Sequence, residues 1–596
     1  MPIYNAPLQD MKFVLHEVLN TAQLADYERF ADAEADLIDA VLEEGAKFAS
    51  EVLAPLNSVG DQEGCVRHAD GSVTTPTGFK EAFKTMVDNG WVSLADDPAY
   101  GGQGLPGILN LAAGEMQSAS NMAFAMYPGL TNGAIKAISI GGSEEQKQTF
   151  LPKMVSGHWT GTMNLTEPHC GTDLGLLKTK AVPNADGSYK ISGQKIFISA
   201  GEHDMSDNII HLVLARIAGA PEGVKGISLF IVPKFKLDKD GNPADRNTVS
   251  CGALEHKMGI HGNSTCVMNY DEAEGYLIGE ENRGLKVMFV MMNRARLDVG
   301  MQGLAQSEVA YQNAVAYARD RLQGRALSGS KNENGPADPL LVHPDVRRML
   351  METRAFNEGA RALIYWAALL EDLEHVHPDE KFREKCDDYL GLLTPVIKGY
   401  LTDKAMMTTI DCQQIFGGHG YIEEWGMSQF VRDARIAMIY EGANGIQALD
   451  LVGRKLARHG GRALMVLSKE IDEYIAAHGD NEPVKDFIDG LRVSKEKLHS
   501  ATMWLMQNGM GNPDNAGAGS VDYMHMVGLS IFAYMWAMMA VSAQASTDGG
   551  SDDDFYKNKL IVGRYFLARM LPQMDAHLAK LQTGAEPVMA LAEDAF

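Results

Sequence analysis

One carboxylate in the chain has neighbours that suit a general base. Glu441 lies in the segment IYEGANGIQ (residues 439–447), between Tyr440 and a glycine-rich turn, and apolar runs flank the segment. A carboxylate in such surroundings is poorly solvated, which raises its pKa toward neutrality and lets it accept a proton there. Taken alone, the segment is explained more simply by a glutamate that caps a helix. Three carboxylates near the motifs below have polar or glycine-rich neighbours and are expected to be surface or capping groups: Glu202, Glu423 and Glu424.

Three further segments combine glycine with side chains that can donate hydrogen bonds or stack. They read NLTEPHCGTD (residues 164–173), QKIFISAG (194–201) and QIFGGHGY (414–421), the last followed by RDAR at 432–435. Glycine lets a backbone approach a planar polar ligand, and threonine can donate a hydrogen bond to its ring atoms. Phe197 could stack on such a ring. An ordinary turn with an aspartate cap and core packing of Phe197 are the alternatives.

The residue pattern changes along the chain. Apolar residues recur three and four apart from about residue 24 to 155, which predicts helices. Short β-branched segments bounded by Gly, Pro, Asp or Asn follow to about residue 281 and predict strands. Helical periodicity then returns, although NGMGNPDNAGAGS (508–520) and STDGGSDDD (546–554) disfavour helix. We predict an α+β multidomain chain with an N-terminal helical domain (1–160), a central β domain (161–281), a second helical domain (282–458) and a C-terminal helical extension (459–596).

Together and in this order, the four motif segments resemble the acyl-CoA dehydrogenase family. The TEP…GTD segment, the QKxFIS strand, the QxFGGxGY segment and the IYEG turn all match, and PAYGGQGL (98–105) matches the loop after the family's first helices. The resemblance covers roughly residues 30 to 455. It implies the family fold of helical, β and four-helix domains, FAD as cofactor, and α,β-dehydrogenation of an acyl-CoA thioester. It also implies an electron-transfer flavoprotein as electron acceptor.

The resemblance assigns roles residue by residue. Glu441 matches the base that removes the α-proton of the thioester, and Ala295 stands where some members carry that base instead. The positions that match FAD contacts are Met163, Leu165, Thr166, Thr172, Phe197, Ser199, Arg321, Gln414, Gly418, Ala443 and Gly445. The positions that match substrate contacts are Thr172, Arg296 and Tyr440. Arg294 competes with Arg296 for its role, and the spacing to Arg321 favours Arg296.

Four of these positions depart from the family's usual residues. Phe197 stands where Trp is common and Ser199 where Thr is common, while Ala443 and Gly445 replace a Thr and a Gln that often contact FAD. Arg321 matches an arginine that reaches the FAD pyrophosphate of a neighbouring subunit. The resemblance therefore implies a homodimer or a dimer of dimers.

The extension beyond residue 458 resembles a longer bacterial branch of the family. That full-length likeness implies a short-chain acyl-CoA substrate. It favours 3-methylthiopropionyl-CoA, oxidised to methylthioacryloyl-CoA in dimethylsulfoniopropionate breakdown, over an ordinary short- or medium-chain fatty acyl-CoA. An oxidase whose flavin reacts with oxygen and a noncatalytic flavin-fold protein are the alternatives, and Glu441 argues against the second.

Composition and motifs exclude several other classes. The chain carries 53 Lys and Arg against 78 Asp and Glu, a net charge of −25, without a basic cluster, so nucleic-acid binding is not expected. A GxGxxG match at residues 102–107 contains Pro106 and follows DDPAY, which predicts a loop rather than a dinucleotide site. His16-Glu17 begins an HExxH pattern but Asn20 occupies the second histidine position, so no metal site is predicted.

The cysteines and termini suggest a location. The six cysteines form no CxxC pair, and the N-terminus lacks the features of a secretory signal or a transit peptide, which predicts reduced thiols and a cytoplasmic protein. The apolar segment Val521–Ala543 is long enough to cross a bilayer. Because Asp522, His525, Gly528 and Ser530 interrupt it, we predict a buried helix of a bundle instead.

Overall fold

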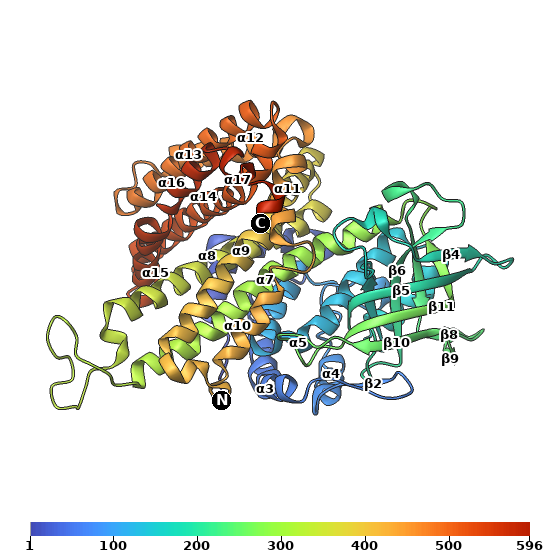
Figure 1. Ribbon diagram of the computed structural model, residues 1–596. Coiled ribbons are helices and arrows are strands. Elements are labelled where there is room, and N and C mark those ends of the chain that lie inside the picture. Colours follow the sequence, from blue (N-terminus) through green and yellow to red (C-terminus); the bar gives the residue numbers. More distant parts are fainter. Residues whose placement is uncertain (1) are drawn as a thin grey trace. The chain divides into compact units, whose positions relative to one another are not determined.

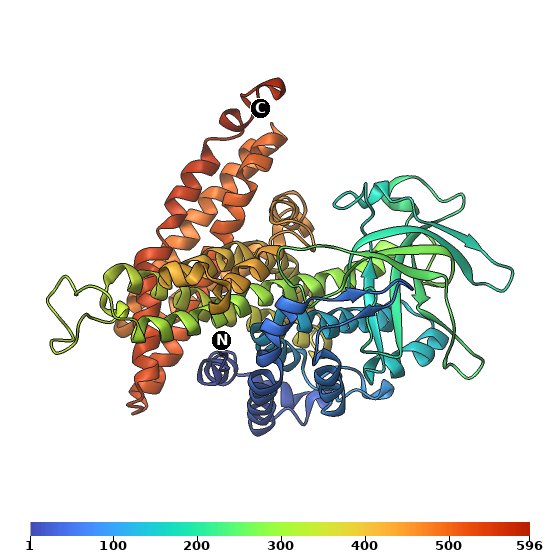
Figure 2. The same cartoon turned by 60° about the horizontal axis from the view of Figure 1, so that its bottom comes forward.

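The computed structural model describes residues 2–596, which divide into two compact units. The sheet unit comprises Glu43–Asp298, and the helical unit comprises the residues up to Leu42 together with Val299–Phe596. Figures 1 and 2 show strands in the first unit and long helices in the second. The predicted α+β multidomain fold class is confirmed, whereas the four domain boundaries stay a prediction.

Helices come first in the sheet unit, and their ends follow ordinary capping rules. Pro55 stands in the first turn of α3, where its missing N–H costs nothing. Ser143 and Gln146 form a capping box at the start of α6, in which each side chain accepts the other's backbone N–H. The GxGxxG match lies in the loop that leads into α5, as predicted. The main helices are α3 (Ala54–Glu63), α4 (Phe79–Asp88), α5 (Gly107–Gly141) and α6 (Glu144–Val155).

A seven-stranded sheet follows these helices. Its order is β10-β11-β5-β4-β6-β3, with β7 pairing both β11 and β6. β3 runs parallel to β6, whereas β5 runs antiparallel to β11 in a register that places Thr265 opposite Ser199. The strands are β3 (Trp159–Asn164), β4 (Lys180–Pro183), β5 (Tyr189–Ser199), β6 (Asn208–Ile217), β7 (Ser228–Pro233), β10 (Val249–Leu254) and β11 (Thr265–Ile278). Two short ribbons accompany the sheet, β1 (Val66–Arg67) with β2 (Val73–Thr74) and β8 (Phe235–Leu237) with β9 (Pro243–Arg246).

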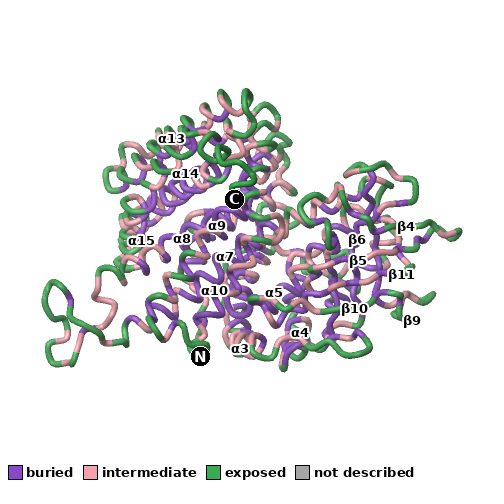
Figure 3. Tube along the Cα trace, in the orientation of Figure 1, coloured by how far each residue is buried: buried purple, intermediate pink, exposed green. Residues whose placement is uncertain are grey.

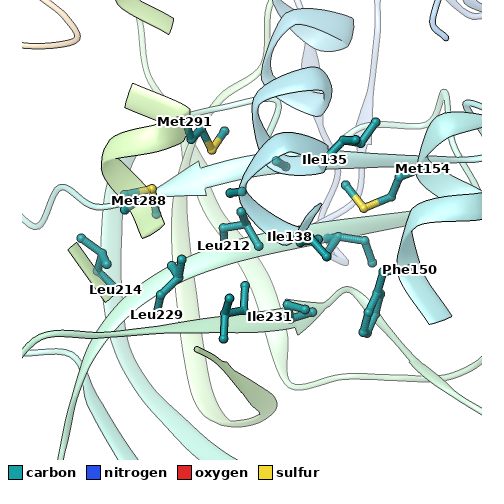
Figure 4. Close-up of a cluster of buried hydrophobic side chains, with 14 of the residues drawn as sticks. Ile135, Ile138, Phe150, Met154, Leu212, Leu214, Leu229, Ile231, Met288 and Met291 are labelled. Atoms are coloured by element: carbon teal, nitrogen blue, oxygen red, sulfur yellow. The ribbon is translucent and has the colours of Figure 1, made fainter. Parts of the chain in front are cut away.

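A buried apolar cluster joins helices and sheet within this unit. Figure 4 shows Ile138 of α5 and Phe150 of α6 facing Leu212 of β6 and Ile231 of β7. Met288, near the start of α7 (Gly284–Asp320), closes the cluster. Each large apolar side chain buried in this way contributes about 1.5–3 kcal/mol relative to its exposed state. The cluster thus packs α5 and α6 against one face of the strands β3, β6 and β7.

The helical unit begins with long antiparallel helices. α8 (Pro344–Val376) and α9 (Glu380–Ile415) pack along their length, and most of their facing residues are buried. α10 (Met427–Ile436) and α11 (Asn444–Asp450) pack against α9. Because α10 and α11 are both short, the chain between them turns sharply at residues 437–443.

The C-terminal extension is built around one apolar helix, α14 (Pro513–Asp548). Its 18-residue apolar window is 83% buried within the protein, as the bundle-helix interpretation predicts, and Figure 3 shows the helix largely in the buried colour. By length and composition, α14 is also the one helix among residues 2–596 that could cross a membrane. The other extension helices are α12 (Arg462–His478), α13 (Lys485–Gly509), α15 (Asp554–Tyr565), α16 (Gln573–Gln582) and α17 (Glu586–Met589).

The predicted linker at residues 508–520 is wrong over most of its length. Only Met510–Asn512 break the helices, because Asn512 caps α14 by accepting the N–H of Asp514, and Pro513 begins the helix. Gly519 continues the helix because it faces α16, where a Cβ would lie 3.2 Å from Leu581 Cγ. Gly519 therefore serves close helix packing rather than a loop.

A buried charge network ties the extension to the rest of the helical unit. Lys559 of α15 donates hydrogen bonds to Asp10 and Glu358, and Arg361 of α8 donates to Asp10 and Glu308. Burial alone would raise the pKa of Asp10, but the two cations lower it below the ordinary value. Each buried charge of the network therefore has an oppositely charged partner, which avoids the large free-energy cost of an unpaired buried charge.

Candidate functional site

The loop that holds Glu441 is strained and supported from one side. This Glu441 loop (residues 437–443) connects α10 to α11, and within it Glu441 has φ +57° and Gly442 has φ +87°. A left-handed backbone at a residue other than glycine costs of the order of 1–3 kcal/mol and persists only where neighbours hold it. The side-chain amide of Gln447 supplies that support, donating hydrogen bonds to the carbonyl oxygens of Glu441 (3.1 Å) and Gly442 (3.3 Å).

The residues beside Glu441 leave room on the exposed side of the loop. Tyr440 is half-buried, and its hydroxyl donates a hydrogen bond to Gln302 on α7. Ala443 and Gly445 are both exposed, and a Cβ at Gly445 would meet nothing within 4 Å. The smaller residues at these two positions therefore leave open space where the family often carries Thr and Gln.

The sheet unit brings two of the motif segments into direct contact. The chain leaving β3 runs beside β5, where the N–H of Ile196 donates a hydrogen bond to the carbonyl oxygen of Thr166 (2.9 Å). Lys195 reaches the neighbouring carbonyl of Leu165 (2.9 Å). Thr166 is half-buried, so its hydroxyl side chain lies within reach of a ligand at this edge of the sheet.

Phe197 has both an unusual backbone and an unusual exposure. Although it lies within β5, its φ is +59°, and its side chain is 60% exposed. Core packing, the alternative raised from the sequence, is therefore wrong. An exposed aromatic ring next to the half-buried hydroxyl of Ser199 provides a flat apolar surface with a polar edge, which is what an isoalloxazine ring requires.

A buried ion pair fixes these two segments to each other. Lys195 and Glu167 have side chains 0% and 3% exposed, and Nζ lies 2.9 Å from Oε1. Glu167 also accepts hydrogen bonds from the Thr179 hydroxyl (2.6 Å) and from the backbone N–H groups of Thr179 and Lys178. Sequence reasoning assigned no role to either partner. The signal was present, since a lysine at an inward position of an alternating strand needs a buried acceptor.

These contacts set the ionisation of Glu167. Burial would raise its pKa, but the Lys195 ammonium and the donated hydrogen bonds lower it below the ordinary value. A carboxylate with a lowered pKa stabilises the folded state above its unfolded pKa, and this contribution is lost as the pH falls through the folded value. Near neutral pH the contribution of the Glu167 carboxylate is therefore fully present.

The remaining sequence-predicted residues of the sheet unit lie at its surface and on α7. Thr172 is exposed in the turn before Leu174, where Asp173 accepts the N–H of Gly175, so the aspartate cap is also present. Met163, at the end of β3, is half-buried against the apolar cluster. Of the two competing arginines, Arg294 pairs with Asp298 (3.3 Å), whereas Arg296 is 7% exposed and contacts Asn293 (3.4 Å).

In the helical unit, aromatic packing lies beside Arg321, expected to reach the FAD pyrophosphate of a neighbouring subunit, and beside Gln414 and Gly418, expected on the adenine side. Arg321 follows the last turn of α7, where Tyr317 stacks on Phe416 with ring centroids 4.1 Å apart. Tyr317 also hydrogen-bonds His419 Nδ1 (2.8 Å). Phe416 and His419 bracket Gly418, which is exposed, as are Arg321 and Gln414. Sequence reasoning missed Tyr317, whose contact partners lie about a hundred positions away.

One expectation about competing carboxylates is wrong. Glu202 is 1% exposed and forms ion pairs with the buried Lys234 and with the exposed Arg246, because the turn after β5 folds inward onto the sheet. Glu423 and Glu424 are exposed in a short turn, as expected, and Glu423 accepts a hydrogen bond from Ser428 (2.7 Å). Unlike Glu441, none of the three has a left-handed backbone at the glutamate itself. Among residues 2–596 no group of His, Cys, Asp and Glu is arranged to hold a metal.

Comparisons with known proteins give the class. Family models match along almost the whole chain: the acyl-CoA dehydrogenase N-terminal domain at residues 35–158, the middle domain at 162–273, the C-terminal domain at 282–456, and the acetyl-CoA dehydrogenase C-terminal-like domain at 467–592. The chain belongs to the acyl-CoA dehydrogenase family, and within it to members that carry an extra C-terminal domain. It is an FAD-dependent oxidoreductase that dehydrogenates acyl-CoA thioesters.

Two acyl-CoA dehydrogenases are similar to this chain over almost its full length. A 3-methylmercaptopropionyl-CoA dehydrogenase of Ruegeria pomeroyi is 42% identical over 584 residues, covering 97% of this chain and 98% of the relative. The broad-specificity linear acyl-CoA dehydrogenase FadE5 of Mycobacterium tuberculosis is 34% identical over 616 residues, with both chains covered completely.

Solved structures agree on the fold. An acyl-CoA dehydrogenase of Bacillus anthracis complexed with FAD superposes with a TM-score of 0.76 at 21% identity, covering 92% of this chain and 89% of that one. A chain from work on the electron transferring flavoprotein of Acidaminococcus fermentans has a TM-score of 0.58 at 26% identity, covering 71% and 98%. The exposed ring of Phe197, beside the Ser199 hydroxyl and the Thr166 segment, fits the cofactor that this class uses.

The ion pair beneath Phe197 yields a first prediction. Lys195→Met removes the cation but leaves the Glu167 carboxylate buried, so we expect a loss of about 3–5 kcal/mol in stability and a lower FAD content. Thermal unfolding followed by circular dichroism, with FAD released on denaturation measured by absorbance, checks both. Lys190→Met is the matched control on the same strand, because the Lys190–Glu272 pair is exposed and such pairs contribute little. Equal behaviour of the two variants would contradict the role of the buried pair.

Proposed function

We propose that Glu441 is the catalytic base of this enzyme and that 3-methylthiopropionyl-CoA is among its best substrates. The observation that carries the substrate assignment is the 42% identity over 97% of the chain to the dehydrogenase of Ruegeria pomeroyi that acts on 3-methylmercaptopropionyl-CoA, the same compound under another name. The observation that supports the base is the strained loop of Glu441, whose backbone carbonyl accepts a hydrogen bond from the amide of Gln447 and whose neighbour Gly445 borders open space.

The chemistry divides between the chain and the cofactor. Glu441 removes the α-proton of the thioester, and its carboxylate becomes a carboxylic acid. FAD, when bound, accepts the hydride from the β-carbon, so that a double bond forms between the α- and β-carbons. The backbone N–H of Glu441 donates to the thioester oxygen as negative charge develops there, in line with the family. The left-handed backbone at Glu441 sets the directions of both its carboxylate and its N–H.

The other proposed site residues bind and orient. Phe197 and Ser199 lie against the flavin ring. The positions Met163, Leu165, Thr166 and Thr172 lie around the pyrimidine of the flavin and on the pyrophosphate side of the cofactor. Tyr440, Arg296 and Thr172 contact the acyl-CoA. The remaining proposed FAD contacts are Arg321, Gln414, Gly418, Ala443 and Gly445. FAD and acyl-CoA, when bound, displace water from around Glu441, which keeps its carboxylate basic near neutral pH.

Electrons leave the enzyme through a protein acceptor in this proposal. A flavoprotein of the electron-transferring class fits, because a related chain was solved in work on such a flavoprotein. The chain is proposed to act in the cytoplasm. Its cysteines support a reducing compartment, since all six are free thiols and four of them are fully buried.

The base assignment predicts the behaviour of Glu441→Gln. The amide keeps the size of the side chain but cannot accept a proton near neutral pH. We expect FAD and acyl-CoA binding to be retained and the rate of flavin reduction to fall at least about 10²–10⁴-fold. Anaerobic stopped-flow mixing with substrate, followed by loss of the oxidised-flavin absorbance, measures this rate. Glu424→Gln, an exposed neighbour, should reduce at the wild-type rate, and fast reduction in Glu441→Gln would place the base elsewhere.

The substrate assignment predicts an order of specificity. Across a panel of acyl-CoAs assayed with an artificial electron acceptor, 3-methylthiopropionyl-CoA and butyryl-CoA should give higher kcat/KM than palmitoyl-CoA. Omitting the acceptor and measuring peroxide tests the oxidase alternative, for which peroxide would match turnover. A maximum at palmitoyl-CoA would contradict the substrate but leave the reaction class intact.

The assembly is a further expectation. We propose a homodimer or a dimer of dimers, in which Arg321 reaches the FAD of the neighbouring subunit. The exposure of Arg321, Gln414 and Gly418 supports this, because an isolated chain leaves these three proposed FAD contacts open to solvent. Light scattering coupled to size exclusion should give two or four chains per particle. A monomer that keeps FAD and full activity would contradict it.

A further inference from the structure

The C-terminal extension packs most closely on the helix that lies beside the Glu441 loop. At Gly399 of α9, a Cβ would come within 2.7 Å of Met524 Cε on α14, and at Gly528 of α14 a Cβ would lie 2.5 Å from the ring of Tyr400. Glycine at both positions lets the two helix backbones approach, so a side chain of ordinary length on α14 can reach polar groups on α9.

The close approach of the two helices brings His525 of α14 into hydrogen-bonding distance of a half-buried carboxylate on α9, that of Asp403. Its Nε2 lies 2.9 Å from Asp403 Oδ2 on α9, and because a carboxylate only accepts, Nε2 donates. Burial lowers the pKa of His525 in spite of Asp403, so the ring is neutral near neutral pH. The ring packs edge-on against Tyr400 at 5.3 Å and lies 5.1 Å from the ring of His577 on α16, which is itself held by Asp522 (2.7 Å).

The second oxygen of Asp403 continues the chain of hydrogen bonds toward the Glu441 loop. Asp403 Oδ1 accepts from Asn444 Nδ2 (2.7 Å), and Asn444 Oδ1 accepts from Lys398 Nζ (2.7 Å). The same nitrogen lies 2.8 Å from the Thr402 hydroxyl oxygen and 3.1 Å from the Gly399 carbonyl oxygen, which share its second N–H. Asn444 is the first residue of α11, three positions after Glu441, and its own N–H closes the loop onto the Met438 carbonyl (3.1 Å).

We propose that His525 of the extension is a positioning residue for the catalytic base, acting through Asp403 and Asn444 on the Glu441 loop. The proposal rests on the assignment of Glu441 as the base. His525 orients the Asp403 carboxylate, the carboxylate orients the Asn444 amide, and Asn444 fixes the end of the loop whose backbone is left-handed at Glu441. The extension therefore has a part in catalysis although it contributes no group to the reaction.

The test compares three substitutions in the full-length holoenzyme. His525→Ala removes the donor to Asp403, whereas His525→Gln retains an amide N–H at the position of Nε2. Gln573→Ala is the matched control, because it removes another hydrogen bond from the extension to α9, that of Lys404 Nζ to Gln573 (2.6 Å), without touching Asp403 or Asn444. Each variant is measured for FAD content, acyl-CoA affinity, rate of flavin reduction, and amide hydrogen exchange in peptides that cover residues 437–446.

The expected result is a selective loss of rate. In His525→Ala flavin reduction should slow roughly 10- to 100-fold, as small displacements of catalytic groups do, with FAD content and acyl-CoA affinity unchanged. Amide exchange in the Glu441 loop should rise. His525→Gln should recover most of the rate, and Gln573→Ala should behave as wild type. Should His525→Ala fail to fold, Asp403→Asn replaces it, with the same expected pattern in the loop.

Two outcomes would overturn the proposal. His525→Ala with wild-type reduction and unchanged exchange would show that the chain of hydrogen bonds does not reach the loop. Equal losses in His525→Ala, His525→Gln and Gln573→Ala would show a general loss of stability. Glu441→Gln, run in parallel, separates the two assignments: fast reduction in that variant refutes the base, whereas amide exchange in the His525 variants still tests the positioning.

Discussion

The buried ion pair between Lys195 and Glu167 is the contact on which the proposed flavin-binding segments of the sheet unit depend. It joins the chain leaving β3 to β5 at the point where Leu165, Thr166, Phe197 and Ser199 gather. Burying two charges is costly, and an apolar pair of similar size is often as stable. A charged pair does what an apolar pair cannot: it fixes the relative positions of two backbones through directed hydrogen bonds, since Lys195 also holds the Leu165 carbonyl.

Backbone strain at Phe197 and Glu441 follows the same logic in each unit. Both residues have a left-handed φ that their side chains disfavour. The Gln447 amide holds the carbonyl of Glu441, and the residue before Phe197, Ile196, is held by its N–H bond to the Thr166 carbonyl. At Phe197 the strain turns a large ring outward from a strand that would otherwise bury it. At Glu441 it presents a carboxylate beside small, exposed residues. Favourable packing elsewhere in the protein, including the apolar cluster of the sheet unit, offsets the free-energy cost of these two strained backbones.

Much of the fold could be predicted from the sequence because its signals are local. Helical and strand periodicities gave the order of helices, sheet and helices, and the segments around Thr166, Phe197, Gln414 and Glu441 were sufficient to recognise the family. The linker predicted at 508–520 failed because glycine composition does not distinguish a loop from a close helix contact, as at Gly519. The contacts Lys195–Glu167, Tyr317–Phe416 and His525–Asp403 could not be predicted, since each joins residues far apart in sequence and no local pattern marks its partner.

The central claim is that the carboxylate of Glu441 removes the α-proton of the thioester. Exchange of the α-hydrogens with deuterium from the solvent tests this step in the absence of hydride transfer. A 3-thia-acyl-CoA has sulfur at the β-position and no β-hydrogen to give up, so in D2O the holoenzyme can only exchange its α-hydrogens. Mass spectrometry of the recovered thioester should show rapid α-deuteration by the wild-type enzyme and by Glu424→Gln. The same experiment with Glu441→Gln should show only the uncatalysed rate. Deuteration at the wild-type rate in Glu441→Gln would contradict the account.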